Sequence, residues 1–206
     1  MNEMIMTLRE WQNCIKPLNQ MIVQASTIDV SDGLTNCSIG MSYGYSLIIK
    51  NANESEYILT QIGNHNKLVN CSISLATDKR RRGNCSINRM NILETLKMND
   101  IHNTHIENSI YYHELPNYKF IISPEGNGID CHRTWEALVL GRIPIIFKHK
   151  INTIFDDLPV IIVDDWNKIS KQFLEKEFDK IIKNWDTYNF DKLTLKYWAR
   201  KINQEV

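Results

Sequence analysis

Residues 118–146 read YKFIISPEGNGIDCHRTWEALVLGRIPII, and this stretch decides the fold. An apolar run at 118–123 predicts a buried strand, which Pro124 ends because proline has no amide hydrogen for a sheet ladder. A glycine-containing loop follows, and the sequence then predicts a helix over 130–140. Gly141 ends this helix and a second strand follows at 143–147, so we expect a right-handed unit with two parallel strands.

The flanking sequence continues this alternation of strands and helices. It predicts further strands at 68–75 and 160–163, a possible short strand at 110–112, and helices at 87–98, 169–185 and 190–202. Earlier in the chain it predicts a helix over 5–25, kinked at Pro17, and short strands at 45–49 and 57–62. We therefore expect an α/β fold: a Rossmann-like parallel sheet flanked by helices over 66–206, preceded by a short N-terminal region over 1–65.

Composition excludes several classes of function. The 206 residues contain 24 Lys plus Arg and 24 Asp plus Glu, a balance that argues against a broad nucleic-acid-binding face. No apolar run approaches the roughly 18 residues of a membrane span, and the N-terminus lacks the pattern of a secretory signal. The five cysteines form no CxxC pair, so we expect neither a zinc site nor a disulfide framework. The expected location is the cytoplasm.

Two loops are placed to bind a ligand. Ligands of parallel sheets sit beyond the carboxyl ends of the strands, and this rule selects loops 76–84 and 123–130. In the second loop, Gly126 and Gly128 allow the backbone to turn and to approach a ligand. Asp130 is the expected N-cap of the helix that follows, whose N-terminus is a favourable seat for a phosphate.

Three polar side chains share one edge of this helix. His132 and Glu136 are four residues apart and Arg133 and Glu136 three apart, so all three can face the same ligand. Arg133 can clamp a diphosphate in a bidentate manner, and Glu136 can accept both hydroxyls of a ribose. Taken singly, each residue also fits a capped turn or a solvated surface pair. Their combination after a buried strand favours a ligand site.

The order of these residues resembles the donor-binding C-terminal domain of glycosyltransferases with the two-domain GT-B fold. The matching positions are Glu125, Gly126, Gly128, Glu136-Ala137, Gly141 and Ile143-Pro144. The chain is most similar to the exostosin-like family, including its short giant-virus and algal members. The resemblance extends over about residues 66–185 and is concentrated in 118–146. If the source is a virus, the expected location is the host cytoplasm.

The resemblance implies a role for each site residue. Glu136 would hold the ribose, and Arg133 would bind the phosphates and, with Glu125, would be a candidate catalytic residue. Glu125, Asn127 and Asp130 would lie near the donor sugar. The remaining substrate-binding candidates are Ser123, Gly126, Gly128, His132, Arg80 and Arg82. For the basic loop that contains Arg80 and Arg82, a purely solvated role stays open.

The implied activity is that of a glycosyltransferase. It would move a hexose or pentose from a UDP- or GDP-linked sugar to a hydroxyl of a glycan or glycoconjugate. We expect no cofactor and no obligatory metal, since an arginine and a helix N-terminus can neutralise the departing diphosphate.

The short N-terminal region leaves three alternatives open. Full two-domain enzymes place their acceptor site in an N-terminal domain, whereas only about 65 residues precede the predicted sheet here. The protein can be a minimal transferase, can complete its cleft with a second subunit or a second copy of itself, or can bind a nucleotide sugar without turnover.

Overall fold

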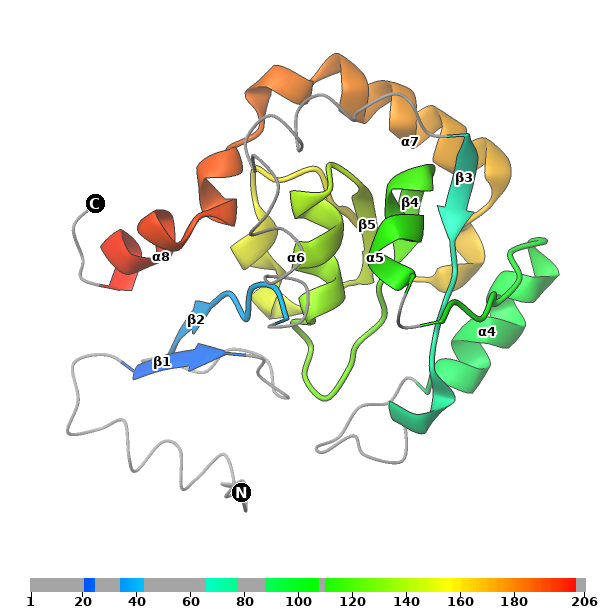
Figure 1. Cartoon of the computed structure of the whole chain (residues 1–206), viewed down its shortest axis with the longest axis horizontal. Coiled ribbons are helices and arrows are strands. Elements are labelled where there is room, and N and C mark those ends of the chain that lie inside the picture. The colour runs from blue at the N-terminus through cyan, green and yellow to red at the C-terminus, as the bar shows by residue number, and fades with distance from the viewer. Residues whose placement is uncertain (1–20, 25–33, 43–65, 78–87, 108–109, 203–206) are drawn as a thin grey trace.

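A parallel sheet of four strands forms the centre of the structure (Figure 1). The computed structural model describes residues 21–24, 34–42, 66–77, 88–107 and 110–202. Within the sheet, β3 (Lys67–Asn70), β4 (Tyr118–Ile122), β5 (Ile143–Phe147) and β6 (Ile161–Val163) lie side by side in chain order. Helices flank this sheet, so the predicted Rossmann-like α/β architecture is confirmed at this level.

Burial on both faces explains the apolar character of the central strands. In β4, Phe120 and Ile122 belong to the core on one face, whereas Ile121 belongs to a core on the other. All three side chains are fully buried. A parallel strand covered on both faces reads as a continuous apolar run rather than as an alternation.

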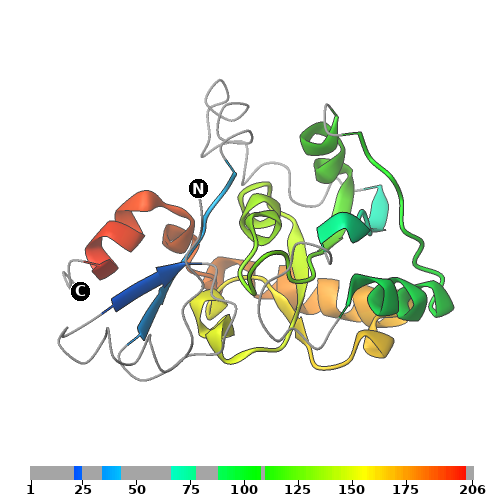
Figure 2. The same ribbon diagram turned by 90° about the horizontal axis from the view of Figure 1, so that it is seen from below.

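Helices cover the two faces separately, as Figure 2 shows. On one face, α7 (Lys171–Lys183) buries Leu174 and Ile181 against the sheet, together with α4 (Arg89–Met98). On the opposite face, α6 (His132–Val139) packs Trp135 and Leu138 against Ile146 of β5. Unit β4–α6–β5 is therefore the predicted strand–loop–helix–strand.

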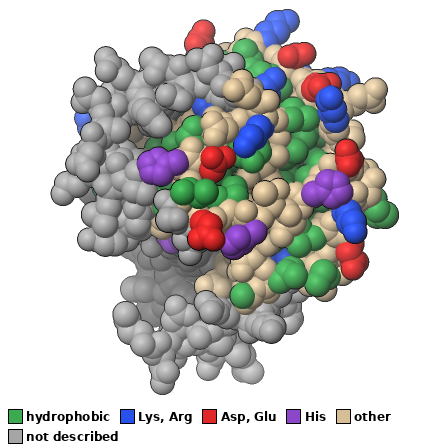
Figure 3. All heavy atoms as spheres, turned by 45° about the vertical axis from the view of Figure 1, so that its right-hand side comes forward, with side chains coloured by type: hydrophobic (Ala, Val, Ile, Leu, Met, Phe, Trp, Pro, Cys, Tyr) green, Lys and Arg blue, Asp and Glu red, His purple; other side chains and the backbone are tan. Residues whose placement is uncertain are grey.

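Shorter elements complete the described part of the chain. They are η1 (Leu75–Thr77), α5 (Tyr111–Glu114), η2 (Leu115–Asn117), η3 (Lys150–Phe155), η4 (Trp166–Lys168), η5 (Trp185–Thr187), η6 (Phe190–Leu193) and α8 (Leu195–Ile202). None of the described helices has the length and apolar composition needed to cross a membrane. Cationic and anionic side chains are interspersed on the face drawn in Figure 3, in keeping with the balanced charge of the sequence.

A small second sheet lies before the main one in the chain. Strands β1 (Met21–Gln24) and β2 (Leu34–Cys37) pair in parallel. The prediction of a helix over 5–25 is therefore wrong for residues 21–24. Residues 1–20 and the strands expected at 45–49 and 57–62 lie outside the described residues.

Three other boundaries differ from the sequence-based prediction. The possible strand at 110–112 is wrong, because Tyr111 begins the helical turn α5. The strand expected over 68–75 stops at Asn70, and further on the Asn103 side chain bonds both the N–H (2.7 Å) and the C=O (3.1 Å) of Ile73 in place of a neighbouring strand. The final helix is interrupted at Thr194, between η6 and α8.

Gly141 ends α6 with a left-handed residue, as predicted. Its φ is 69°, its N–H donates to Leu138 O at 2.9 Å, and Arg142 N donates to Ala137 O at 2.8 Å. This pair of bonds is the Schellman motif, which satisfies the last carbonyl groups of a helix. The motif turns the chain directly into β5.

Replacing Gly141 tests how much this turn contributes to stability. Gly141→Ala puts a Cβ at a positive φ, so we expect the free energy of unfolding in urea to fall by about 1 kcal/mol or more. Gly141→Asn is the matched control and should lose less, because asparagine tolerates this conformation better. Equal losses in the two variants would contradict a conformational origin.

Candidate functional site

Two adjoining cavities lie beyond the carboxyl ends of β3 and β4. The first, of about 350 Å³, is lined by the loop 124–131 and by Thr77 and Arg89, and we call it the loop cavity. The second, of about 520 Å³, is lined by Tyr111, Tyr112 and Glu136 among others, and we call it the tyrosine cavity. Ser74 and Arg133 line both cavities, so the two spaces meet at these side chains.

Most of the predicted site residues gather around these cavities. Those that line the loop cavity are Gly126, Asn127, Gly128, Asp130, His132 and Arg133. Glu136 lines the tyrosine cavity. The lining residues do not include Ser123 or Glu125, and Arg80 and Arg82 lie outside the described residues. The buried Ser123 hydroxyl instead bonds Thr134 Oγ1 at 2.9 Å, tying the end of β4 to α6.

The glycine loop is folded tightly onto Cys131. Gly126 N donates to Gly128 O at 3.0 Å, and the Cys131 thiol lies 3.6 Å from both Pro124 O and Gly128 O. A Cβ added at Gly126 would lie only 3.1 Å from Cys131 Sγ. The missing side chain at Gly126 therefore permits a close approach within the loop itself. Burial raises the pKa of the Cys131 thiol to about 11, so this sulfur is a packed thiol.

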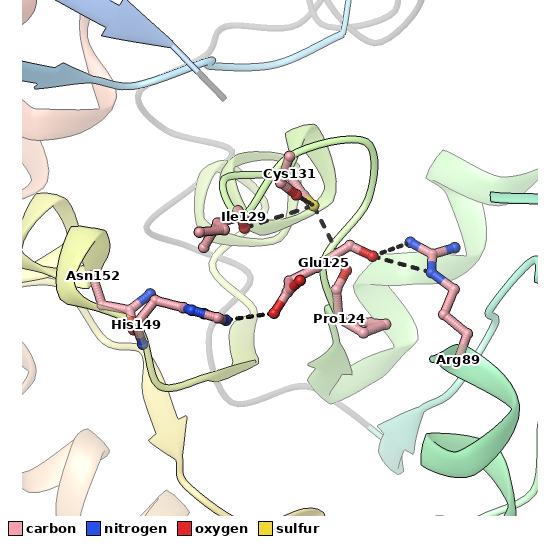
Figure 4. A network of polar contacts seen from close by, with 8 residues as sticks. Arg89, Pro124, Glu125, Ile129, Cys131, His149 and Asn152 are labelled. Carbon is pink, nitrogen blue, oxygen red and sulfur yellow. Dashed lines mark hydrogen bonds and ion pairs between the residues drawn. The ribbon is translucent and has the colours of Figure 1, made fainter. Parts of the chain in front are cut away.

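A buried arginine that sequence reasoning missed supports this loop (Figure 4). Arg89 donates from Nε (3.1 Å) and Nη2 (2.8 Å) to the carbonyl oxygen of Glu125. Its Nη1 bonds Ser74 O at 2.9 Å and Thr77 Oγ1 at 3.0 Å. One guanidinium thus joins the segment after β3 to the loop after β4.

A signal for Arg89 is present in the sequence. The residue is the first of α4, behind the N-cap Asn88. A cation is disfavoured at a helix N-terminus by the helix dipole, so an arginine there indicates a partner elsewhere. The sequence-based prediction instead placed a substrate-binding arginine in the preceding basic loop, which lies outside the described residues.

The Glu125 carboxylate turns away from the cavities. Its Oε1 bonds Nε2 of His149, which follows β5, and Figure 4 shows this side chain and the Arg89-bound carbonyl pointing in opposite directions. Glu125 is 7% exposed. This geometry gives Glu125 a role in anchoring the loop. Its carboxylate does not line either cavity, although we expected it near the donor sugar. No pattern in the sequence around Glu125 indicates that His149, 24 residues away, is its partner.

Asp130 is not the N-cap of α6, and that prediction is wrong. The N-cap position is Cys131, which makes no capping side-chain hydrogen bond. Asp130 instead accepts from Ile39 N at its Oδ2 and from Trp135 Nε1 at its Oδ1, both at 2.7 Å. No described side chain caps the first turn of α6, so its N–H groups and partial positive charge stay available to an anion at the loop cavity.

Residues 37–42 lie along the N-terminal edge of α6. Besides the bond from Ile39 to Asp130, His132 Nδ1 bonds Gly40 O at 2.8 Å. Glu136 Oε1 accepts from Ser42 Oγ at 2.6 Å and from Ser42 N at 3.3 Å. The three predicted polar residues of the edge do face one way, but two of them hold this N-terminal segment.

Arg133 lies between the two cavities, beside the ring of Tyr111. Its guanidinium carbon lies 5.8 Å from the centre of the Tyr111 ring, within the range of a cation–π contact. No described acidic side chain forms an ion pair with Arg133, so the alternative of a solvated Arg133–Glu136 pair is not seen in the described part of the chain. The arrangement favours an anionic ligand at the junction of the cavities.

The described ranges contain no candidate metal site. No group of three or more His, Cys, Asp and Glu side chains there is arranged to hold a metal ion. The two aspartates after β6 have other roles, because Asp165 caps η4 and Asp164 pairs with Lys168.

Comparison of the sequence with models of protein families gives no match, and comparison with curated proteins gives none either. The resemblance to exostosin-like glycosyltransferases therefore remains a prediction drawn from the residues of this chain.

The buried Asp130 predicts a pH dependence of stability. Burial raises its pKa to about 6 from 3.8, although the bonds from Ile39 and Trp135 act in the opposite direction. A raised carboxyl pKa stabilises the fold below the unfolded pKa, and this contribution is lost as pH rises through the folded pKa. We expect the stability of the wild type relative to Asp130→Asn to fall by up to roughly 3 kcal/mol between about pH 4 and about pH 7.

Urea unfolding of both proteins across this range measures the effect. The difference between the two free energies of unfolding is the quantity to follow, because other titrating groups cancel in it. A difference that stays constant or grows with pH would contradict the burial of an ionisable Asp130.

Proposed function

We propose that this protein is a glycosyltransferase that binds a nucleoside diphosphate sugar across the two cavities. The nucleoside occupies the tyrosine cavity beside Glu136, the diphosphate lies at Arg133 and the N-terminus of α6, and the sugar extends into the loop cavity. The observation that carries this proposal is Arg133, which lines both cavities without an acidic partner among the described residues.

The sizes and linings of the cavities support this orientation. Each cavity falls within the range of small-molecule sites, and the tyrosine cavity has aromatic side chains to pack against a base. The loop cavity offers Asn127 and the backbone of the glycine loop to a polar sugar. In this orientation the nucleoside, the diphosphate and the sugar each lie beside side chains or backbone groups suited to bind them.

Catalysis in this proposal acts mainly on the leaving group. As the glycosidic bond to the diphosphate breaks, negative charge grows on the departing phosphate oxygen. Arg133 and the uncapped N–H groups of α6 stabilise that charge, which lowers the barrier. The sugar passes to a glycan hydroxyl, whose proton goes to a general base if the reaction inverts the anomeric configuration.

One observation favours a second candidate, a nucleotide-sugar-binding module without turnover. The acids that we expected near the donor already accept protein hydrogen bonds: Glu125 from His149, Asp130 from Ile39 and Glu136 from Ser42. Each is poorly placed to take a proton from an acceptor. A base must then be a group other than these three acids, or turnover does not occur.

Donor turnover separates these two candidates. Purified protein is incubated with UDP- and GDP-linked sugars in EDTA, and the released nucleotide is measured with and without glycan acceptors. Release above the background of Glu136→Ala supports the transferase. Tight nucleotide binding without release supports the binding module.

Glu136→Ala tests the nucleoside end of the site. We expect the affinity for UDP or GDP, measured by calorimetry, to fall by about tenfold to a hundredfold, because hydrogen bonds to a charged group contribute about 1.5–3 kcal/mol. Glu175→Ala, on the exposed surface of α7, is the matched control and should bind like the wild type. An unchanged affinity in a folded Glu136→Ala protein would show that the ribose assignment is wrong.

Arg133→Ala tests the phosphate end. We expect binding of the diphosphate to weaken by about tenfold or more, while binding of the corresponding nucleoside without phosphates stays within about twofold. Arg133→Lys keeps the charge but loses the bidentate geometry, so an intermediate affinity is expected. Equal losses for nucleotide and nucleoside would indicate a structural effect in place of phosphate binding.

A further inference from the structure

The segment 37–42 is held in a defined shape before it reaches Glu136. Cys37 is buried in the core that contains Trp135, which fixes the start of the segment on α6. Gly40 has a φ of 67° and donates its N–H to Ser38 Oγ at 2.9 Å, which forms a tight turn. The turn brings Ser42 to the helix edge one turn further along α6.

Ser42 then saturates one oxygen of Glu136. Its hydroxyl and its backbone N–H both donate to Oε1, at 2.6 and 3.3 Å, and Tyr112 OH approaches the same oxygen at 3.4 Å. The Ser42 and Tyr112 hydroxyls also lie 2.9 Å apart. A carboxylate oxygen has two lone pairs, so these donors fill the capacity of Oε1. No described residue donates to Oε2.

Burial makes these donors necessary. Glu136 is only 4% exposed, and the described residues supply no cation to pair with it. A buried carboxylate without hydrogen bonds is strongly disfavoured, so Ser42 and Tyr112 supply part of what water would otherwise provide. They also restrict the rotation of the carboxylate, which leaves Oε2 as the open acceptor.

The residues that line the tyrosine cavity show on which side of Glu136 the contact with Ser42 lies. Glu136 and Tyr112 line the tyrosine cavity, whereas the lining of that cavity does not include Ser42. The serine therefore holds Glu136 from outside the space that a ligand would fill. A plug that competes with the ligand would itself lie in the cavity.

We infer that Ser42 is a positioning residue for nucleotide binding: it orients the Glu136 carboxylate so that Oε2 accepts a ribose hydroxyl. This inference rests on the proposed function. It makes the donor site a composite of two parts of the chain, because a residue after β2 sets the geometry of a helix that follows β4.

Nucleotide titrations of Ser42 variants test the inference. Calorimetry with UDP and GDP should show about a tenfold loss of affinity in Ser42→Ala, the effect of one hydrogen bond to a charged group. Ser42→Thr retains the hydroxyl and should recover affinity to within about threefold of the wild type. Thermal unfolding establishes that both variants are folded.

The 2′-deoxy form of the better nucleotide separates positioning from a general structural effect. If Ser42 acts through the contact between Glu136 and the ribose, the loss caused by Ser42→Ala should shrink to less than about threefold with this ligand. A loss of the same size with both ligands overturns the inference, as does an unchanged affinity.

Other outcomes are equally decisive. A higher affinity in Ser42→Ala would mean that the segment competes with the ligand, which also overturns the inference.

If Ser42→Ala fails to fold, the wild type and Ser42→Thr decide: Ser42→Thr must bind like the wild type and must discriminate against the 2′-deoxy ligand to the same degree. A wild type that binds neither UDP nor GDP rejects the proposed function and this inference together, whereas wild-type binding without the Ser42 effect rejects the inference alone.

Discussion

The hydrogen bonds from Arg89 to the carbonyl of Glu125 are the contact on which the site depends. Burying a guanidinium is costly unless its N–H groups find acceptors, and here Nε, Nη1 and Nη2 all do so. The acceptors belong to the segments that follow β3 and β4. Because these strands are adjacent and parallel, their carboxyl ends open side by side, and one long cationic side chain can bridge both segments. The loop cavity exists between the parts that Arg89 holds together.

The charge at the N-terminus of α6 depends on how the preceding loop is held. With the Glu125 carboxylate drawn to His149 and Asp130 drawn to Ile39 and Trp135, neither acid caps the helix. The N-terminus therefore keeps its partial positive charge, and Arg133 in the first turn adds a full one. A chain with balanced formal charge can in this way present a local positive field to an anion. The donors that hold these carboxylates away from the helix cap therefore contribute to that field alongside Arg133.

The sequence predicts the β4–α6–β5 unit well because the information is local. Apolar runs, helical spacing and Gly141 specify strand, helix and stop within 29 residues, and no distant contact is needed to interpret them. The helix edge of His132, Arg133 and Glu136 follows from the same periodicity. The partners of His132 and Glu136 do not, since Gly40 and Ser42 lie 92 and 94 positions from them in the chain. Likewise, the expected cap at Asp130 fails because a buried tryptophan and a distant backbone amide are better placed to donate to its carboxylate than the first helical turn.

The hydrogen bonds that the acidic side chains accept at this end of the sheet limit their role in the proposed reaction. Glu136 has one oxygen committed to Ser42 and the other open to a ligand, so it is suited to accept hydrogen bonds and poorly suited to move as a base. Asp130 is enclosed by its two donors, and Glu125 lies behind the loop. In the proposed function these three acids can thus contribute to binding of the donor, but they are poorly placed to take a proton from an acceptor. Under the proposed function, the described residues therefore account for donor binding better than for acceptor activation, because the three acids near the cavities are held by donors from other parts of the chain.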